Sequence, residues 1–473
     1  MNALHTYRET GELLILGSGE SAVGAALLAK AKGWRAFVSE HGEIAPASRR
    51  ELEAAGIPYE ENGHSEAALQ RASLVIKSPG IPQEAPIVRS VRANFLPLIS
   101  EIEFGYHYCP GKIIGVTGTN GKTTTVRLIQ HILQCGGVKS CLCGNIGNSF
   151  CRELATQPPF HWYVLEISSF QLDDVVDFHP HIAVITNLSP NHLNRYNHDF
   201  SAYANAKLNL LRNQTAEDYL IYSLDSPLLT EALEGVEVRS QPLGFSLAPQ
   251  PGAATFIDNH FIRFTMPKNK KKRRLPIDAI KLQGEHNRYN VMAASLVGDL
   301  VNVRNENIRD SLSEFENSPH RLEEVGKIEG VTFINDSKAT NVNAAWYALR
   351  STNADIIWIA GGVDKGNDYG ELLEIVKEKV KGLIMIGKDT ARLEDSFNGH
   401  IKFLLKADSM DEALKKAWEI ATEGDNVLLS PACASFDQFE NYEERGEAFR
   451  KAFKKRAEWV EKARRSGGNF TRF

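Results

Sequence analysis

A glycine-rich turn in the first third of the chain has the residue types of a phosphate-binding loop. Residues 115–124 read GVTGTNGKTT, after the apolar residues KII and before VRLIQHILQ. A helix N-terminus has unpaired N–H groups and a partial positive charge, and glycines let a polyphosphate approach the backbone closely. Lys122 would add a positive charge for the β- and γ-phosphates, and the Thr123 hydroxyl suits Mg²⁺. The segment therefore predicts an ATP site.

The turn departs from the standard loop G-x-x-x-x-G-K-[ST], because Val116 occupies the position of the first glycine. Gly118 takes over the early turn, and the variant reads TGTNGKT. A glycine-rich strand-to-helix turn with an incidental lysine is the alternative interpretation. The order of strand, loop and helix favours the ATP site.

A second glycine turn, GSGESA, follows the apolar residues ELLIL near the N-terminus. Gly17, Gly19 and Ala22 satisfy G-x-G-x-x-[GA], and Glu40 ends the next predicted strand, near the spacing of a ribose-binding acid. Taken alone, this pattern would predict NAD. Many nucleotide-binding turns share it, so we interpret the turn as a site for a nucleotide diphosphate of unspecified kind.

These turns belong to three segments of alternating strands and helices. Residues 1–106 alternate strands (ELLILG, RAFVSE, SLVIKSPGI) with helices such as SAVGAALLAKAKG. Residues 107–317 begin with the ATP loop and, after residue 218, contain short predicted strands (YLIYSLDS, LGFSLA, ATFIDNHFIRFTM, IDAIKL) before the helix GEHNRYNVMAASLVGDLV. Residues 318–473 alternate again, with strands TFINDS, DIIWIAGG, GLIMIG, KFLLK and NVLLSPA, and end in a charged surface helix.

The predicted fold class is therefore α/β with three domains. We expect a Rossmann-like N-terminal domain, a central P-loop ATPase-like domain with added β-strands, and a Rossmann-like C-terminal domain. In such sheets the ligand binds at the carboxyl ends of the strands. Polar residues fall at these ends, at Ser78–Gly80, Glu166, Asp336–Thr340, Gly361–Lys365 and Ser430–Ser435.

Composition excludes several classes of protein. The chain has 473 residues, 42% hydrophobic and 24% charged, with a formal net charge of −5, which argues against nucleic acid as the main partner. The basic run KNKKKRR (268–274) is interpreted as a solvated loop, and no apolar stretch is long enough to predict a membrane span. Six scattered cysteines without a signal peptide predict reduced thiols in the cytoplasm.

Seven motifs together resemble one family over nearly the whole chain. GVTGTNGKTTT, GNIG, LEISSFQL, GEHNRYN, PHRLE, NDSKATN and SPACASFDQF occur in the order found in the Mur ligases of bacterial cell-wall synthesis. The motifs DSKATN and SPACASFDQF most resemble the members that add D-glutamate. The resemblance implies that ATP phosphorylates the carboxylate of UDP-N-acetylmuramoyl-L-alanine, and that the amine of D-glutamate attacks the acyl phosphate to form an amide. It implies domains at 1–106 for the UDP substrate, 107–317 for ATP and 318–473 for the amino acid.

The resemblance also implies a role for each matching residue. Catalytic roles fall on Lys122, Glu166, His192 and Lys207. The implied ATP contacts are Gly118, Thr119, Asn120, Gly121, Lys122, Thr123, Thr124, Asn287, Asn290, Arg321 and Asp336. The implied contacts to the UDP substrate are Gly17, Ser18, Gly19, Glu20, Ser21, Ser39, Glu40, Ser78, Pro79, Gly80, Asn145, Ser168 and Gln171. The implied D-glutamate pocket consists of Lys338, Thr340, Lys365, Ser435 and Tyr442.

Two Mg²⁺ ions are implied, with ligands from Thr123, Glu166, His192 and Lys207. An ordinary lysine is a cation and binds no metal, but in this family the lysine at the position of Lys207 is carbamylated, which supplies anionic oxygen ligands. Without the resemblance, Lys207 would be read as a solvated helix residue. Around His192 the family usually has D-H-[LM]-D, whereas this chain has Asn191 and Asn194. The second metal site is therefore expected to be weakened by about 10–100-fold if those acids support it.

Three alternatives stay open. Another ligase of the superfamily would add L-alanine, a diamino acid, or glutamate to folate, although Lys338 and Lys365 favour a dicarboxylate. An NAD(P)-dependent oxidoreductase fused to a P-loop module would explain GSGESA but not DSKATN. A non-catalytic nucleotide-binding homologue would explain Asn191 and Asn194. We also expect a monomer, and a third domain that closes over ATP about a hinge near ENSPHR.

Overall fold

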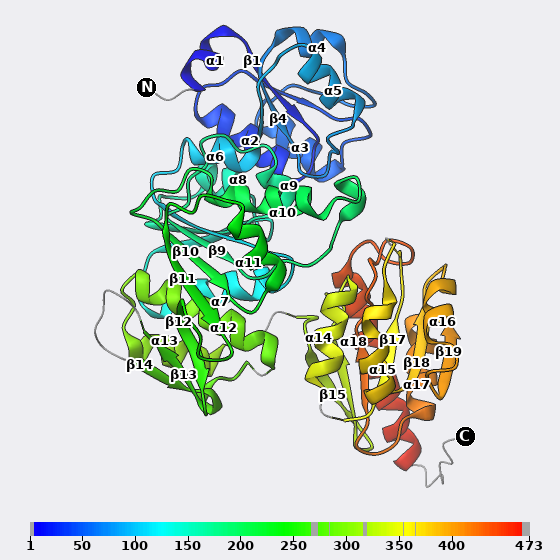
Figure 1. Cartoon of the computed structure of the whole chain (residues 1–473). Helices are drawn as coiled ribbons and strands as arrows, with labels where there is room; N and C mark the ends of the chain where they lie inside the picture. Colours follow the sequence, from blue (N-terminus) through cyan, green and yellow to red (C-terminus); the bar gives the residue numbers. More distant parts are fainter. Residues whose placement is uncertain are drawn as a thin grey trace. The chain divides into compact units, whose positions relative to one another are not determined.

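The computed structural model describes residues 4–265, 273–282, 284–315, 319–352, 354–364 and 366–465. The chain forms two compact units, residues 1–283 with 287–315, and residues 284–286 with 316–473. The first unit contains two β-sheets and the second contains one (Figure 1). This agrees with the α/β class and the three sheets predicted from the sequence.

The first sheet has five parallel strands in the order β3-β2-β1-β4-β5. Alternate residues of its central strand are buried on opposite faces, Leu13 and Ile15 in one core and Leu14 and Leu16 in the other, which explains the continuous apolar run. Its strands are β1 (Glu12–Leu16), β2 (Ala36–Ser39), β3 (Tyr59–Glu60), β4 (Ala72–Lys77) and β5 (Leu98–Ser100). Its helices are α1 (Leu4–Thr10), α2 (Glu20–Ala31), α3 (Pro46–Ala54), α4 (Glu66–Arg71), α5 (Pro86–Ala93) and α6 (Glu101–Tyr106).

The second sheet has nine strands in the order β14-β13-β12-β11-β10-β9-β6-β8-β7, and only the pairs β12–β13 and β13–β14 are antiparallel. One face packs against α7 and α12, and both faces are buried. Its strands are β6 (Lys112–Thr117), β7 (Ser140–Gly144), β8 (Trp162–Glu166), β9 (Ile182–Ile185), β10 (Tyr219–Ser223), β11 (Gln241–Ser246), β12 (Ala253–Asp258), β13 (Phe261–Phe264) and β14 (Arg273–Pro276). Its helices are α7 (Lys122–Cys135), α8 (Phe150–Thr156), α9 (Ser169–Leu172), η1 (Leu193–Arg195), α10 (Phe200–Leu208), η2 (Asn209–Leu211), α11 (Pro227–Glu234), η3 (Ile277–Ala279), α12 (Glu285–Leu300) and α13 (Asn305–Glu314).

The third sheet has six strands in the order β15-β16-β20-β17-β18-β19, parallel except for the pair β15–β16. Helices α17 and α18 cover one face and α14 and α15 the other. Its strands are β15 (Glu323–Ile328), β16 (Val331–Asn335), β17 (Ile356–Ala360), β18 (Val380–Ile386), β19 (Phe403–Ala407) and β20 (Asn426–Leu429). Its helices are α14 (Val342–Ser351), η4 (Tyr369–Leu372), α15 (Leu373–Lys379), α16 (Ala391–Phe397), α17 (Met410–Ile420) and α18 (Tyr442–Arg465).

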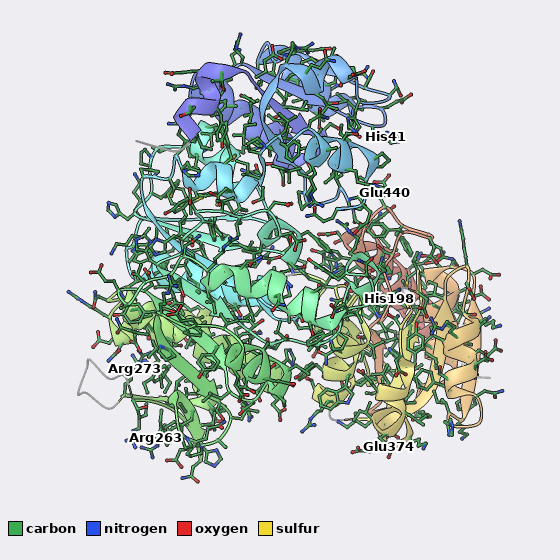
Figure 2. The ribbon with its side chains drawn as sticks, turned by 45° about the horizontal axis from the view of Figure 1, so that its top comes forward. His41, His198, Arg263, Arg273, Glu374 and Glu440 are labelled. Carbon is green, nitrogen blue, oxygen red and sulfur yellow. The ribbon has the colours of Figure 1, made fainter. Side chains whose placement is uncertain are left out.

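Two local predictions in the strand-rich part are wrong. The segment IDAIKL begins as the 3₁₀ turn η3, and the strand lies just before it, at β14. Arg273 and Arg274 of the basic run therefore belong to a strand, and Arg273 is paired with Asp299 and covers the Phe264 ring instead of being solvated. Figure 2 shows Arg263 and Arg273 on these added strands. A buried ion pair overrode the expectation from local charge, while residues 268–272 lie outside the described ranges.

The final helix α18 was expected to lie on the surface, but several of its side chains are buried. Phe449, Ala452 and Val460 of α18 are buried against the third sheet, and Arg445 is only 1% exposed. All six cysteines are unpaired, as predicted for reduced thiols. Within the described ranges, no helix is both long and apolar enough to cross a membrane.

Candidate nucleotide and metal site

The predicted phosphate loop connects the buried strand β6 to the N-terminus of α7. Two glycines of the loop are needed for both their backbone conformation and the space around them. Gly118 has φ 138°, and a Cβ there would lie 2.0 Å from Thr186 Oγ1. Gly121 has φ 82°, and a Cβ there would lie 2.5 Å from Asn290 Oδ1. The variant TGTNGKT therefore forms a tight strand-to-helix turn without the missing first glycine.

The lysine of the loop is held over the turn. Lys122 Nζ donates to the carbonyl oxygens of Gly118 and Thr119, at 2.9 Å each. Thr119 Oγ1 lies 3.0 Å from the hydroxyl of Tyr203 and donates to Ser189 O. The ammonium group thus lies at the loop, and its role in binding phosphate stays a prediction.

Two residues that sequence reasoning missed hold the loop in place. Asn187 Oδ1 accepts from the Asn120 amide at 2.9 Å, and its Nδ2 donates to Asn120 O at 3.1 Å. Thr186 Oγ1 donates to the same carbonyl at 2.6 Å. Both residues follow β9 directly. A polar pair at the carboxyl end of a buried strand is the sequence pattern from which they could have been predicted.

The asparagines of the GEHNRYN motif lie in α12, and both are buried. Asn290 Oδ1 accepts from Thr125 at 3.2 Å, and its Nδ2 donates to Asn287 Oδ1 at 3.2 Å. These contacts place Asn290 directly beside the phosphate loop, since its Oδ1 also limits the space at Gly121.

Glu166 ends β8 and is 3% exposed, which excludes the alternative of a solvated strand-end glutamate. Its Oε1 accepts from Asn145 Nδ2 at 2.9 Å, while its Oε2 is buried without a hydrogen-bond partner. Thr124 Oγ1 in the first turn of α7 is also buried without a partner. Uncompensated buried oxygens are costly in a folded protein. An oxygen-binding cation would satisfy the carboxylate.

Lys207 lies in α10 and is 2% exposed, so the alternative of a solvated helix lysine is wrong. Its Nζ lies 4.8 Å from the centre of the Tyr203 ring. Burial lowers its pKa well below the usual lysine range, and the positive charge of Lys122 lowers it further, against the opposing effect of Glu166 and Asp173. A buried amine of lowered pKa is neutral at a lower pH than an ordinary lysine.

The His192 loop lies between β9 and α10. His192 has a left-handed backbone with φ 54°, and its ring packs edge-on against Phe170 at 5.3 Å. The guanidinium of Arg195 lies over the Phe170 ring, 4.4 Å from the ring centre. Tyr196 donates to Asp173, whose pKa is raised to about 6 chiefly by burial.

The loop LEISSFQL ends in a capping box at the start of α9. Gln171 Oε1 accepts from the Ser168 backbone N–H and hydroxyl, at 3.0 and 3.1 Å, and the Ser168 hydroxyl in turn accepts from the Gln171 N–H. Two predicted substrate contacts are therefore positioned by each other.

Several of the polar residues predicted to bind the UDP substrate lie near the N-terminal glycine turn. Ser18 donates to Glu40 at 2.9 Å, and Ser39 donates to Glu60 at 2.7 Å. Ser78 Oγ is buried without a hydrogen-bond partner, and it lies 2.6 Å from where a Cβ of Gly17 would be. The structure therefore brings the predicted residues after β1, β2 and β4 to one edge of the first sheet, where Ser21 is the second residue of α2.

Arg195 connects the turn after β4 to the His192 loop. Its guanidinium donates to the carbonyls of Pro79, Gly80 and Ile81 at 3.2–3.3 Å. The carboxylate of Glu20 contacts the domain of the second sheet, because it accepts hydrogen bonds from the Arg152 guanidinium and the Ser149 N–H. The first two sheets are thus joined by contacts that the sequence did not reveal.

In the second unit, Asp336 follows β16 and accepts from the Leu322 N–H and the Ser430 hydroxyl, at 3.1 Å each. Burial raises its pKa to about 6, against the opposing charge of Arg321. Lys338 Nζ lies 5.1 Å from the Tyr442 ring centre, which brings two of the predicted amino-acid contacts together.

The structure says less about the other predicted residues of the amino-acid pocket. Ser435 is buried and Thr340 is half-buried, whereas Lys365 lies outside the described residues. Sequence reasoning missed Arg445, which is buried beside them. Its guanidinium donates to Ser337 Oγ, Ser337 O and Cys433 O, and burial lowers its pKa to about 10. Arg445 thereby joins the DSKATN loop to the loop after β20.

Comparisons with known proteins identify the family of the chain. Residues 13–87 match the MurD N-terminal domain, residues 116–298 the Mur ligase middle domain, and residues 320–433 the Mur ligase, glutamate ligase domain. The UDP-N-acetylmuramoylalanine–D-glutamate ligase of Christiangramia forsetii is 45% identical over 93% of this chain and 98% of its own length. The protein of that name from Porphyromonas gingivalis (strain W83) is 44% identical over the same shares of the two chains.

A solved structure shares the fold at low sequence identity. The crystal structure of MurF ligase from Thermotoga maritima in complex with ADP matches with a TM-score of 0.59 at 15% identity, covering 91% of this chain and 99% of that one. Because three domain models match in sequence order and relatives above 40% identity align over nearly the whole length, the chain belongs to the Mur ligase family, on the branch of its UDP-N-acetylmuramoylalanine–D-glutamate ligases.

Proposed function

We propose that this chain is an ATP-dependent ligase that joins D-glutamate to UDP-N-acetylmuramoyl-L-alanine in peptidoglycan biosynthesis. The observation that carries the proposal is the burial of Glu166 and Lys207 in the domain whose loop holds Lys122, in a chain whose relatives bear the name of that enzyme. Charges of Lys122 and Glu166 both act on Lys207, so the three groups share one electrostatic environment.

The reaction consists of two successive steps, a phosphoryl transfer and then an acyl transfer. The substrate carboxylate attacks the γ-phosphorus of ATP, the bond to ADP breaks, and an acyl phosphate forms. The amine of D-glutamate then attacks the acyl carbon, loses a proton, and expels inorganic phosphate to leave an amide. Both anionic groups must be held in line while positive charge offsets their repulsion. Lys122 and the N-terminus of α7 supply such charge at the loop.

The residues present fit a divalent cation beside the ATP phosphates. Glu166 Oε2 is a buried oxygen in need of a partner, and Thr123 at the start of α7 offers a hydroxyl. We assign these two residues to Mg²⁺, which prefers oxygen ligands and would neutralise charge on the phosphates. Asn145 holds the Glu166 carboxylate through its other oxygen.

A second Mg²⁺ would use His192 and a carbamylated Lys207. Carbamylation joins the neutral amine to carbon dioxide and releases a proton, and burial lowers the lysine pKa in the direction this step needs. Asn191 and Asn194 supply no negative charge there, so we propose a weaker second site than in relatives with two acids.

The remaining residues bind the two organic substrates. The N-terminal turn, including Gly17, Gly19 and Ser78, would hold the uridine diphosphate group. Lys338, Thr340, Ser435 and Tyr442, with Lys365, would hold the two carboxylates of D-glutamate. We propose that the chain acts as a monomer in the cytoplasm, and its six free cysteines fit a reducing compartment.

The decisive experiment measures ATP-dependent phosphate release with UDP-N-acetylmuramoyl-L-alanine and one amino acid at a time. We expect release with D-glutamate and none with L-glutamate, L-alanine or meso-diaminopimelate. Release with one of the other amino acids would assign a different ligase activity. ATP binding without release with any of them would identify a non-catalytic homologue.

A further inference from the structure

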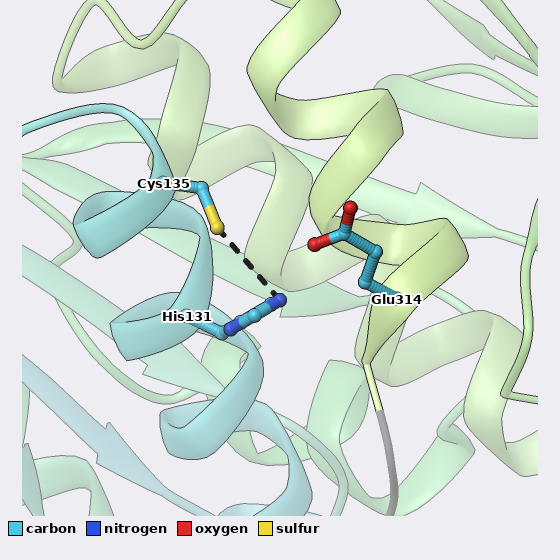
Figure 3. A group of neighbouring side chains, drawn as sticks. All are labelled: His131, Cys135 and Glu314. Carbon is cyan, nitrogen blue, oxygen red and sulfur yellow. Dashed lines mark hydrogen bonds between the residues drawn. The ribbon is translucent and has the colours of Figure 1, made fainter.

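A thiol, an imidazole and a carboxylate meet away from the phosphate loop, at the opposite end of α7. His131 and Cys135 are four residues apart on that helix and so project from one face. Glu314 comes from the last turn of α13, which packs against α7 (Figure 3). One ligand atom of each side chain lies within 4.8 Å of the other two.

The separation between the thiol and the imidazole is close to that in a tetrahedral metal site. Bond lengths of about 2.3 Å for Zn–S and 2.0–2.2 Å for Zn–N and Zn–O give ligand-to-ligand distances of about 3.4–3.6 Å. Cys135 Sγ and His131 Nε2 are 3.8 Å apart. Cys135 and Glu314 are exposed and His131 is half-buried, so small side-chain rotations suffice to close the remaining gap.

The local field also favours a cation. Cys135 ends α7 and Glu314 ends α13, and the last turn of neither helix contains a lysine or arginine. A helix C-terminus carries partial negative charge, and the carboxylate of Glu314 adds to it. Two helix ends and one carboxylate therefore place negative potential at the point where the thiol and the imidazole lie.

We propose that His131, Cys135 and Glu314 form a binding site for a transition-metal cation of the Zn²⁺ class, with water as the fourth ligand. Sulfur and imidazole ligands select Zn²⁺ over Mg²⁺, whose preferred ligands are oxygens. The bound ion joins the end of α13 to the helix that begins at Lys122. Since Glu314 is one residue before Phe315, at the end of the first unit, the ion fixes the point where the chain leaves that unit.

The test uses the full-length chain with Mg²⁺ in excess, so that oxygen-rich sites are occupied. Co²⁺ is titrated as a spectroscopic probe and then displaced by Zn²⁺. We expect a sulfur-to-cobalt charge-transfer band with one equivalent of Co²⁺, lost on adding Zn²⁺. The other five cysteines are buried or half-buried, which makes Cys135 the accessible sulfur ligand.

Single variants assign the ligands. Cys135→Ser removes the band, and His131→Gln and Glu314→Gln each weaken Zn²⁺ binding by more than about tenfold, the smallest loss usual even for a supporting group of a metal site. The matched control is Glu306→Gln, which removes an exposed carboxylate from the first turn of the same helix α13. Absence of the band, a band retained in Cys135→Ser, or equal losses in Glu306→Gln and Glu314→Gln would each overturn the proposal.

Discussion

Asn145 Nδ2 donates to Glu166 Oε1 at 2.9 Å, and this leaves Glu166 Oε2 buried without a partner. One oxygen of the carboxylate is thus held by a hydrogen bond within the protein, and the other is not. The pair joins the carboxyl ends of β7 and β8, since Asn145 directly follows β7.

Replacing Glu166 by Gln should separate stability from activity. The substitution removes a buried charge whose Oε2 has no partner, so we expect unchanged or slightly raised thermal stability. Ligase activity should fall by about 10²–10³-fold, as for other groups that stabilise developing charge. Activity and thermal unfolding measured on one preparation test this. Asn145→Ala is the companion variant. We expect it to lose less ligase activity than Glu166→Gln, and we expect added Mg²⁺ to restore part of that activity. Full activity in Glu166→Gln would remove this residue from the site.

Lys207 should be essential as a neutral amine that can be modified. Lys207→Arg keeps a positive charge that cannot be lost and should be inactive, like Lys207→Ala. Short carboxylates such as formate or acetate should partly restore Lys207→Ala, because they replace the missing oxygen ligand, and should leave Lys207→Arg inactive. Phosphate release at increasing carboxylate concentration measures this. No rescue of Lys207→Ala would count against a carbamate.

Two glycines of the N-terminal turn should respond differently to alanine. At Gly17 a Cβ meets Ser78 at 2.6 Å, and φ is 98°, so Gly17→Ala should lower stability. A Cβ added at Gly19 would meet no atom within 4 Å beyond its chain neighbours, and φ is −75°, so Gly19→Ala should fold normally. If a diphosphate binds against that backbone, Gly19→Ala should raise KM for the UDP substrate at least several-fold. An unchanged KM with intact folding would place the diphosphate elsewhere.

Two glutamates of α6 should give opposite dependences of stability on pH. Burial raises the pKa of Glu101 to about 7, so the folded state binds more protons than the unfolded state above the ordinary value of 4.5. Stability is therefore lost as pH rises through about 4.5–7. Glu101→Gln should remove this loss and stabilise the protein at pH 8 by on the order of 2–3 kcal/mol, with little effect near pH 4.5.

Glu103 is the matched control for that experiment. Burial acts to raise its pKa, but hydrogen bonds from His107 and from the Val176 and Asp177 N–H groups outweigh it, and the net pKa is lowered. The contribution of Glu103 to the stability of the folded state is present above the ordinary glutamate pKa and is lost as pH falls. Glu103→Gln should therefore destabilise the protein at pH 8. Denaturant unfolding at several pH values would reveal the two opposite trends, and equal trends would contradict them.

Restoring the family's acids should strengthen the second metal site. Asn191 Oδ1 accepts from the His192 N–H at 2.9 Å, a bond that an aspartate can keep. We expect Asn191→Asp with Asn194→Asp to lower the Mg²⁺ concentration needed for half-maximal activity by about 10–100-fold. The measurement is phosphate release against Mg²⁺ concentration at saturating ATP. An unchanged requirement would show that these two positions do not support a metal in this chain.

Several elements were predictable because their signals are local. The apolar runs ELLIL and IIWIA are buried on both faces of their sheets, so a short run of apolar residues was enough to predict β1 and β17. The turn before α7 was likewise predictable from its glycines, and Gly118 and Gly121 do adopt positive φ there. β14 was missed because the charge of Arg273 suggested solvent, whereas a distant residue, Asp299, pairs with it.

The amino-acid sequence by itself determined the α/β class, the glycine turns and the family motifs, because these depend on periodicity and on residues close together in the chain. Only the tertiary structure decided the state of the functional groups. The lowered pKa of Lys207 and the unpaired Oε2 of Glu166 come from burial among elements separated by dozens of residues. Asn187 and Arg445 became visible for the same reason, since each holds a loop far from it in sequence. Burial and long-range hydrogen bonds have no periodicity along the chain, and they set the chemistry of this site.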